Sequence, residues 1–263
     1  APFYFYYNPH RYPAFLSGVA QCFTNDERSS NYRKDVFIAS GGTERSPSSL
    51  DIRLSDALVH SGGKYLDAFV LEYICPYELV SDDQLSMELE QAIEHAHEMK
   101  REGKIRYVMA STHSHSVGLA LASATLPSHP DTAAFDAIML RYSMSHRIAA
   151  ESLSLPKALE NNIPVLAFTT TRWNRLQSDP PAMTDSRPTT SDCLKFALNH
   201  PAVEIVLHSA RDNDELDEAI LPLFSSASSG QSTWLSEDEY ERWLTYGSDE
   251  MKWNENDAFD EYP

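Results

Sequence analysis

The chain has 263 residues, of which 42% are hydrophobic, and this length suits one large barrel or two small domains. Its net charge is −18, which excludes functions that need clustered lysine and arginine, such as binding nucleic acid or an anionic membrane. No apolar run reaches the roughly 18 residues of a membrane-spanning helix, so no transmembrane segment is expected.

Seven short apolar segments are predicted to be strands, and their lack of alternation is typical of parallel strands that are buried on both faces. These segments are residues 3–7, 35–39, 68–71, 106–110, 137–140, 165–168 and 204–207. Helical patterns lie between them and predict an α/β architecture. The predicted helices include 50–58, a longer one over 85–99 behind a Ser81-x-x-Gln84 capping box, and 117–124, 157–161, 190–198 and 214–221.

Seven strand–helix units are one fewer than a closed (β/α) barrel requires. We therefore expect a TIM-type (β/α) barrel that is incomplete at its N-terminus. Three explanations remain open: the barrel is open, the polypeptide is longer, or something else closes the gap.

A Ser/Gly-rich linker at 225–232 separates the predicted barrel, residues 1–224, from a C-terminal segment, residues 225–263. This segment holds a short helix that Ser236 caps, and then an acidic tail. Residues 236–263 contain ten acidic and two basic residues. The segment also carries five large aromatic side chains, so we expect it to pack on the barrel or on a protein partner. These are Trp234, Trp243, Trp253, Phe259 and Tyr262.

The three cysteines, Cys22, Cys75 and Cys193, are scattered and show no CxxC spacing. This argues against a disulfide framework and against a structural zinc site. The chain begins at Ala1 without a basic-then-apolar leader, so we expect any presequence to have been removed. The sequence does not decide whether the protein lies in the cytoplasm or in an organelle.

One segment carries a more specific sequence pattern than the rest of the chain. Residues 103–113, GKIRYVMASTH, read as a glycine that ends a helix, a basic step, and a buried strand that opens into a polar loop. In α/β folds the carboxyl end of a strand is where ligands bind. This segment resembles the fifth strand of the aldo-keto reductases. Five further segments resemble that family in the right order: residues 55–67, 135–142, 163–168, 197–203 and 209–216.

The resemblance implies an aldo-keto-reductase-like barrel, and it also implies a site for catalysis. Members of the family use Asp, Tyr, Lys and His; the tyrosine donates a proton as hydride arrives. Tyr12 matches the catalytic tyrosine. Tyr7 stands at the aspartate position, Gly41 at the lysine position and Glu72 at the histidine position. Some members that reduce carbon–carbon double bonds carry glutamate at that last position.

Loss of the lysine has the largest consequence, because a tyrosine without a neighbouring cation keeps a pKa near 10 and relays protons poorly. Arg11 or Arg45 could supply a cation from another direction. Tyr12 could instead be a rim aromatic without chemistry. Glu72 is a candidate catalytic carboxylate, and its alternative is a structural salt bridge to Arg106 or Arg141.

The resemblance also implies a cofactor site for NADPH. Ser111 and Thr112 stand where the family holds the nicotinamide amide, Arg141 stands at a position that is often glutamine, and Phe168 stands where an aromatic ring stacks on nicotinamide. Ser209, Arg211 and Asp214 lie in the segment that clamps the adenosine phosphate, although Asp212 and Asp214 would repel it. We therefore expect either no cofactor, or NADPH if the ancestral site is retained.

No metal site is expected, because His113-x-His115 would need a third ligand, such as His10, that no spacing supports. Two functional hypotheses follow. The first is a catalytically degenerate barrel that works as a binding or assembly subunit of a larger complex. The second is an NADPH-dependent oxidoreductase that reduces a carbonyl or an activated double bond, with Tyr12 and Glu72 in an atypical site.

Overall fold

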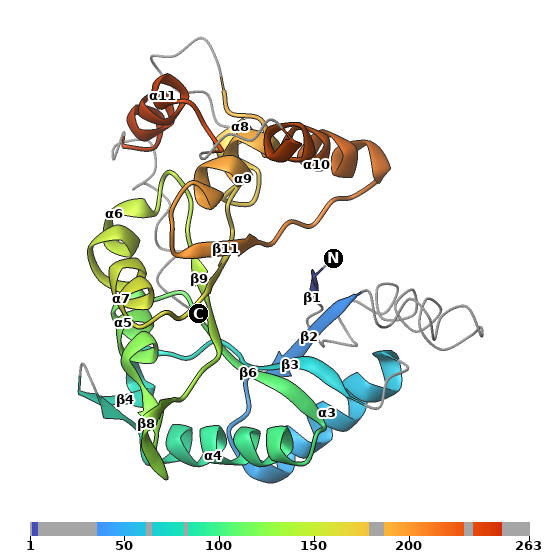
Figure 1. Cartoon of the computed structure of the whole chain (residues 1–263), viewed down its shortest axis with the longest axis vertical. Coiled ribbons are helices and arrows are strands. Elements are labelled where there is room, and N and C mark those ends of the chain that lie inside the picture. Colours follow the sequence, from blue (N-terminus) through green and yellow to red (C-terminus); the bar gives the residue numbers. More distant parts are fainter. Residues whose placement is uncertain are drawn as a thin grey trace. The chain divides into compact units, whose positions relative to one another are not determined.

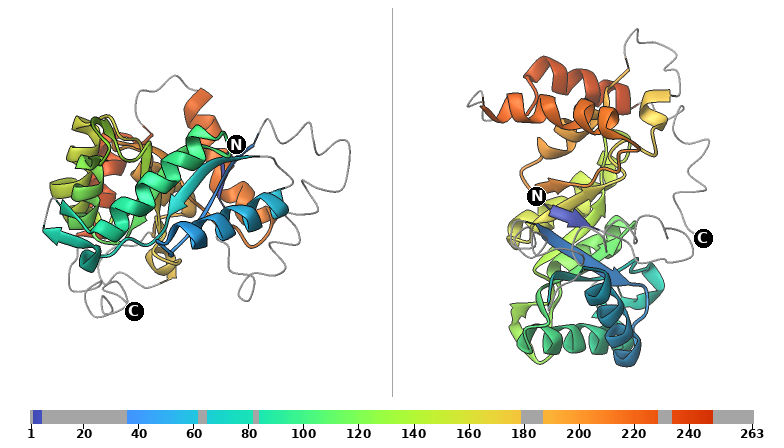
Figure 2. Two further views of the ribbon diagram at one scale, coloured as in Figure 1. Left: turned by 90° about the horizontal axis from the view of Figure 1, so that it is seen from below. Right: turned by 90° about the vertical axis from the view of Figure 1, so that its right-hand side faces the viewer.

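The computed structural model describes residues 2–4, 36–61, 65–81, 84–178, 187–228 and 234–248. The chain forms two compact units, Ala1–Ile138 and Met139–Pro263 (Figures 1 and 2). Strand β9 (Ala137–Arg141) begins in the first unit and ends in the second. No helix within the described ranges is long and apolar enough to cross a membrane.

The first unit is built on parallel strands that follow one another in sequence order: β1 (Pro2–Tyr4), β2 (Phe37–Gly42), β3 (Leu66–Leu71) and β6 (Ile105–Thr112). Helix α3 (Pro47–Ser61) connects β2 to β3, and α4 (Met87–Arg101) leads into β6. Both helices pack against one face of these strands (Figure 1). Helix α5 (His115–Ser123) follows β6.

The second unit continues the same alternation with β10 (Val165–Phe168) and β11 (Val203–Val206), which pair in parallel. Helix α9 packs against β11 and α10. The helices of this unit are α6 (Arg147–Ala149), a π-helical turn (Ala150–Ser154), α7 (Leu155–Glu160), α8 (Arg175–Ser178), α9 (Thr190–Leu198), α10 (Asn213–Ser228) and α11 (Glu237–Gly247).

All seven predicted strands are found, in the hydrogen-bonding order β1-β2-β3-β6-β9-β10-β11. For β1 the structure describes Pro2–Tyr4, and the rest of the predicted segment lies outside the described residues. Gly103 ends α4 as predicted, with a φ of 73°, and its N–H donates to the carbonyl of Lys100.

Two antiparallel hairpins were not predicted: β4 (Leu79–Ser81) with β5 (Gln84–Leu85), and β7 (Thr125–Leu126) with β8 (His129–Ala133). The first hairpin corrects the predicted start of α4. Ser81 and Gln84 pair with each other across the hairpin, and the N-cap is Ser86, whose hydroxyl accepts from the N–H of Leu89 at 3.3 Å. A strand pairing therefore overrides the local capping pattern.

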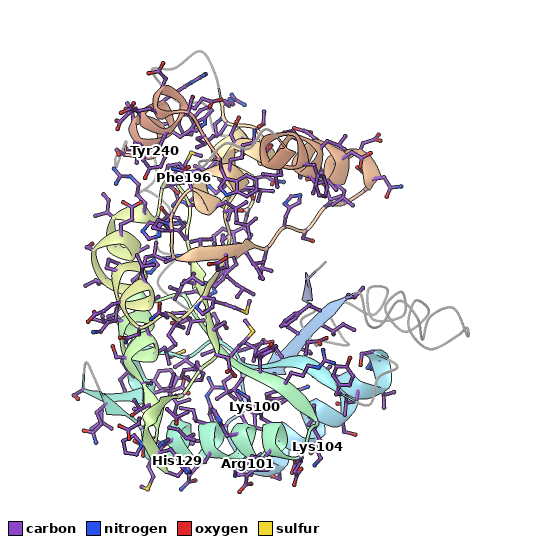
Figure 3. All side chains as sticks on the ribbon, in the orientation of Figure 1. Lys100, Arg101, Lys104, His129, Phe196 and Tyr240 are labelled. Atoms are coloured by element: carbon purple, nitrogen blue, oxygen red, sulfur yellow. The ribbon has the colours of Figure 1, made fainter. Side chains whose placement is uncertain are left out.

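Two carboxylates fix the amino-terminal ends of the strands in the first unit. Asp67 accepts from the N–H of Ile38 and from the guanidinium of Arg106, each at 2.9 Å. Asp136 accepts from the N–H of Val108 at 2.8 Å and from the ammonium of Lys100 at 2.7 and 2.8 Å (Figure 3 labels Lys100). Each carboxylate thus ties one strand's backbone to its neighbour and is charge-balanced by one cation.

Helix α11 packs on the second unit through its aromatic side chains. Trp243 and Tyr246 are buried, and the Tyr246 hydroxyl donates to the carbonyl of Leu176 at 2.7 Å. Tyr240 stacks on Phe196 of α9, with ring centroids 5.4 Å apart (Figure 3). Part of the aromatic C-terminal segment is therefore covered within its own unit, whereas Trp253, Phe259 and Tyr262 lie outside the described residues.

We expect Gly247→Ala to destabilise the protein by about 1–3 kcal/mol, the usual effect of overpacking. A Cβ at Gly247 would lie 2.1 Å from the carbonyl oxygen of Met144, which is backbone and has little freedom to move. Urea denaturation followed by tryptophan fluorescence measures the change. Glu241→Ala, on the exposed side of the same helix, is the control and should shift stability by about 0.5 kcal/mol or less. Equal effects of the two substitutions would contradict the tight contact.

Candidate functional site

The carboxyl ends of β2, β3 and β6 form one edge of the first unit, because the three strands are parallel and in register. Gly42 pairs with Leu71, and Leu71 pairs with Ala110. The chain segments that follow stay bonded to one another: the N–H of Glu72 donates to Gly42 and the N–H of Ile74 donates to Ser111. Glu72, Ser111 and Thr112 are thereby brought to the edge where α/β folds bind ligands.

Gly41, at the position of the expected lysine, lies in unusually close contact with the neighbouring strand. A Cβ built on Gly41 would lie 1.8 Å from the carbonyl oxygen of Val70 and 2.9 Å from its nitrogen. Real Cβ atoms do not approach backbone so closely. In this backbone, position 41 therefore accepts glycine and leaves no room for a longer side chain.

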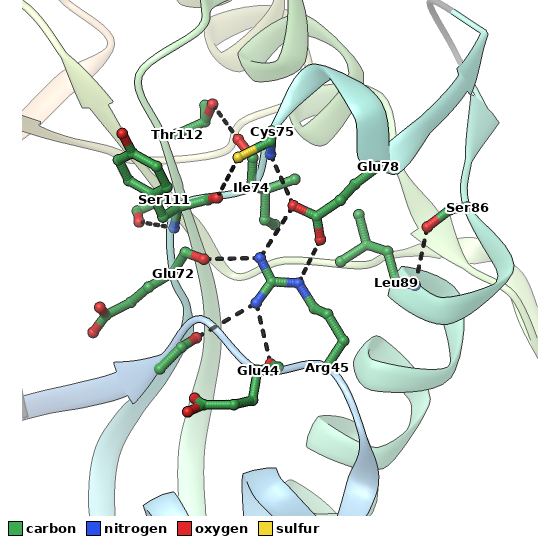
Figure 4. A network of polar contacts seen from close by, with 12 residues as sticks. Glu44, Arg45, Glu72, Ile74, Cys75, Glu78, Ser86, Leu89, Ser111 and Thr112 are labelled. Carbon is green, nitrogen blue, oxygen red and sulfur yellow. Dashed lines mark hydrogen bonds and ion pairs between the residues drawn. The ribbon is translucent and has the colours of Figure 1, made fainter. Parts of the chain in front are cut away.

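Arg45 is buried and organises the loops beyond these strands (Figure 4). Its Nε donates to Glu78 Oε1 at 2.6 Å, and Nη2 donates to Glu78 Oε2 at 3.3 Å and to the carbonyl of Glu72 at 2.8 Å. Nη1 donates to the carbonyls of Glu44 and Gly42 at 3.1 and 3.5 Å. These are five hydrogen bonds for five N–H groups. Arg45 is consequently committed to the backbone and to Glu78, and its charge is neutralised there.

Ser111 and Thr112 make hydrogen bonds to the backbone that follows β3. The Thr112 hydroxyl donates to the carbonyl of Ile74 at 2.7 Å and accepts from the N–H of Ser114 at 3.1 Å. The Ser111 hydroxyl accepts from the N–H of Tyr73 at 2.9 Å. Thr112 is 1% exposed. Thr112 therefore has no hydroxyl proton left for the amide of a nicotinamide ring in this arrangement.

Tyr73 was not singled out in the sequence and has the most unusual backbone of this edge. Its φ is 57°, a left-handed conformation that is rare for a bulky residue. The hydrogen bond from its N–H to Ser111 and the contact of the Cys75 thiol with its carbonyl hold it in place. Its ring lies edge-on to His113, with centroids 4.9 Å apart. Because the conformation depends on contacts made by other loops, no local sequence signal could have revealed it.

Glu72 is 3% exposed and lies directly after β3. The predicted alternative of a salt bridge to Arg106 was wrong. Arg106 pairs with Asp67, and in the β3–β6 register Asp67 is five residues before Glu72. At about 3.3 Å per residue, the two positions are at opposite ends of the strand. Arg141 belongs to the second unit, where it is the half-buried last residue of β9.

The described lysines of the first unit lie at the edge opposite the candidate site. Lys100 bonds to Asp136, and Lys104 precedes β6 and pairs with Glu102 at 2.7 Å. Lys34 and Lys64 lie outside the described residues, as do Tyr12 and Arg11. Within the described part of the first unit, the cations near the carboxyl ends of β2 and β3 are therefore arginines: Arg45, and Arg53, whose Nε donates to Glu44 at 3.0 Å.

The remaining cofactor candidates belong to the second unit. Phe168 is the half-buried last residue of β10, and its carbonyl accepts from the N–H of Tyr142 at 3.2 Å. Ser209 and Asp214 are exposed, and Asp214 is in the first turn of α10.

The amino end of α10 is already satisfied by carboxylates. Asp212 accepts from the N–H of Glu215 at 2.9 Å, and Glu215 accepts from the N–H of Arg211 at 2.7 Å and from its Nε at 3.0 Å. These hydrogen bonds from Arg211 hold the pKa of Glu215 below its usual value. A phosphate would have to displace one anion and lie beside others, so this helix end fits the phosphate of NADPH poorly.

His113 and His115 do not form a metal centre with other described residues: no group of three or more His, Cys, Asp or Glu side chains suited to a metal ion is found in those ranges.

Glu78, which sequence reasoning missed, is the acidic residue that pairs with the buried guanidinium of Arg45. A buried glutamate in a Pro-containing turn 33 residues away carries no local signal of that pairing.

A scan of the sequence against protein-family models finds no match, and a search of curated proteins finds none. Solved structures, in contrast, match with confidence. The holo form of the aldo-keto reductase AKR11C1 from Bacillus halodurans matches with a TM-score of 0.60 and 18% identity, over 83% of this chain and 75% of that one. Aldose reductase from Giardia lamblia matches with a TM-score of 0.62 and 13% identity, over 93% and 82%.

A third match is the thermostable aldo-keto reductase Tm1743 in complex with the inhibitor epalrestat, with a TM-score of 0.57 and 18% identity, over 83% and 75% of the two chains. At these identities the likeness concerns the fold. The chain has the α/β fold of an incomplete aldo-keto-reductase-like (β/α) barrel, as the sequence resemblance predicted.

We expect Arg45→Met to destabilise the protein by about 3–5 kcal/mol, because it leaves Glu78 as a buried charge without its partner. The double variant Arg45→Met/Glu78→Met should recover part of that loss, since it removes both charges. Arg53→Met is the matched control: its ion pair with Glu44 is about one-third exposed and should be worth about 1 kcal/mol or less. Urea denaturation midpoints compare the four proteins. Similar losses in Arg45→Met and Arg53→Met would contradict the central role of Arg45.

Proposed function

We propose that this chain is a catalytically degenerate aldo-keto-reductase-like barrel that works as a binding or assembly subunit of a larger complex. The observation that best supports this proposal is the close contact between Gly41 and the backbone of Val70. Reduction by the family's usual route needs a lysine beside the tyrosine to lower its pKa. The backbone at position 41 has no space for that lysine.

The surroundings of this edge support the same proposal. Arg45 cannot act as the missing cation for a phenol, because all five of its N–H groups are bonded and Glu78 balances its charge. An arginine would also be a poor proton relay, because it does not deprotonate in proteins. Glu72 places a carboxyl group at the same edge, and in its ionised form it would raise the cost of forming a phenolate nearby.

A lack of cofactor binding is expected on the same grounds, because the candidate cofactor residues are engaged within the protein. Thr112 donates to Ile74, and Arg211 is 81% exposed at its side chain and paired with Glu215. The C-terminal segment is acidic in its sequence. Residues 236–263 carry ten acidic residues against two basic ones, which favours a partner with a basic surface.

The alternative function is an NADPH-dependent oxidoreductase that reduces a carbonyl or an activated double bond. One observation favours it: Glu72 is buried at the carboxyl end of β3, where the reductase resemblance places a catalytic residue. A buried carboxylate at a ligand-binding edge is a common feature of catalytic sites. In this alternative Tyr12 and Glu72 would contact the substrate.

We expect NADPH to show no saturable binding, because the hydroxyl of Thr112 already donates within the chain and a carboxylate, that of Asp212, already accepts from an N–H in the first turn of α10. Titration of the protein with NADPH, followed by tryptophan quenching and by the cofactor's own emission, measures this. Saturable binding that Arg211→Ala weakens would contradict the proposal and favour the reductase. Glu204→Ala, an exposed position on β11, is the control for nonspecific effects of substitution.

We expect Gly41→Ala to destabilise the protein by about 1–3 kcal/mol or to prevent folding, because even a methyl group would clash with the backbone of Val70. Gly42→Ala is the matched control one residue away. A Cβ there meets the carboxylate of Glu44 and the side chain of Arg53, which can move, so we expect a loss of about 1 kcal/mol or less. Thermal unfolding compares the two. A Gly41→Ala variant as stable as Gly42→Ala would contradict the tight contact, and carbonyl reduction by the unsubstituted chain would overturn the proposal.

A further inference from the structure

The helical segment that follows β9 presents a row of apolar side chains to solvent. Helix α6, the π-helical turn and α7 run without a break over residues 147–160 (Figure 1). Ile148 is 56% exposed, Leu159 48% and Leu153 38%, and Pro156 is exposed as well. We call these four residues the α6–α7 stripe. A contiguous apolar surface that folding leaves exposed is typical of a docking site.

The spacing of the stripe shows that its members share one face of the helix. Ile148 and Leu153 are five residues apart, which is the hydrogen-bonding interval of the π-helical turn between them. From Leu153 onward the members follow at intervals of three, which makes them neighbours on an α-helix. The buried residues repeat this spacing two positions later, about 200° around the helix, so they form the opposite face. They are Ala150, Leu155 and Ala158.

The charges around the stripe balance one another. Arg147 pairs with Glu151 at 3.2 Å and Lys157 pairs with Glu160 at 2.9 Å, and residues 147–160 carry no other charged side chain. Helix α10 of the same unit also exposes apolar side chains, but it contains four acidic residues and no lysine or arginine. In a chain with a net charge of −18, an acidic segment is therefore repelled less by the stripe than by α10.

The described part of the second unit ends beside the first residue of this stripe. Helix α11 is fixed at its carboxyl end, because Gly247 lies against the backbone of Met144. The hydroxyl of the next residue, Ser248, accepts from Nη2 of Arg147 at 3.0 Å. Arg147 directly precedes Ile148, so the chain continues from Ser248 at one end of the stripe.

Residues 249–263, which we call the tail, have the composition and the length to cover the stripe. The stripe is about 17 Å long at 1.5 Å per residue, and 15 residues reach up to about 50 Å when extended. Because the tail belongs to the same chain, it meets the stripe at a higher effective concentration than a separate partner does. Six acidic residues and one lysine of the tail accompany four large apolar ones: Met251, Trp253, Phe259 and Tyr262.

We propose that the tail docks on the α6–α7 stripe of its own chain, with its apolar side chains against Ile148, Leu153 and Leu159. Burial of the aromatic rings supplies the affinity. The balanced charges of the helix let the carboxylates of the tail remain in solvent without a like-charged support beneath them. This inference goes beyond the proposed function and uses no residue of the candidate site. NADPH binding would contradict the proposed function and leave the docking of the tail unaffected.

The test uses the full chain and the emission of Trp253, taken as the difference between each protein and its Trp253→Phe counterpart. Acrylamide quenching measures the exposure of this ring, and the urea-unfolded chain is the fully exposed reference. We expect protection of Trp253 in the native chain, and Leu153→Ser/Leu159→Ser should raise its quenching most of the way to the reference. The matched control is Ile52→Ser/Val59→Ser on α3, at residues that are 61% and 69% exposed; it should leave the quenching unchanged. Thermal unfolding checks that both variants fold.

A second measurement approaches the contact from the tail and leaves the helix unsubstituted. In the full chain, Met251→Ser/Phe259→Ser/Tyr262→Ser should speed amide hydrogen exchange over residues 147–160, because the stripe loses its cover. Exchange in α3 should stay the same. Mass spectrometry of peptides from the two helical segments compares the rates.

Four results would refute the docking of the tail. They are a Trp253 as exposed in the native chain as in urea, equal effects of the two double variants, and unchanged exchange over residues 147–160 in the tail variant. The fourth is protection of Trp253 that disappears on dilution, because the occupant would then be the tail of a second copy.

Discussion

The hydrogen bonds of the Arg45 guanidinium are the interaction on which the carboxyl-terminal edge of the first unit's strands depends. One side chain reaches three backbone carbonyls and one carboxylate, which come from the ends of β2 and β3 and from the turn that follows. Removing any one acceptor would leave a buried N–H without a partner, so the loops are held as a set. The backbone of Glu72 and the turn that carries Glu78 are both bonded to this one residue.

Charged side chains are hydrogen-bonded at both edges of these strands, but the two edges use charges of opposite sign. At the amino-terminal edge, Asp67 and Asp136 are acceptors that bind strand amides, with Arg106 and Lys100 as their counterions. At the carboxyl-terminal edge a cation is the centre and carbonyls surround it. In a chain with a net charge of −18, the few described cations of this unit are thus used for structure. Among the described residues, the lysines of this unit lie at the opposite edge from Glu72, Ser111 and Thr112.

The strands were predictable because each is an uninterrupted apolar run, and Gly103 was predictable because a left-handed helix end favours glycine. The hairpins were not, because β5 has two residues and its pairing depends on the burial of Leu85. At the site, positions could be predicted and contacts could not. Ser111, Thr112 and Glu72 lie at the expected edge, but the sequence could not tell that Thr112 is bonded to Ile74 or that Arg45 belongs to Glu78.

The contact between Gly41 and Val70 also bears on how such a chain can change over time. The backbone of Val70 lies so close to Gly41 that only a hydrogen atom fits in place of a side chain. A single codon change that introduced lysine would meet the neighbouring backbone before it could offer any proton-transfer benefit. The strands would first have to separate, which needs compensating changes elsewhere in the sheet. The geometry therefore keeps position 41 as glycine until the backbone around it has changed first.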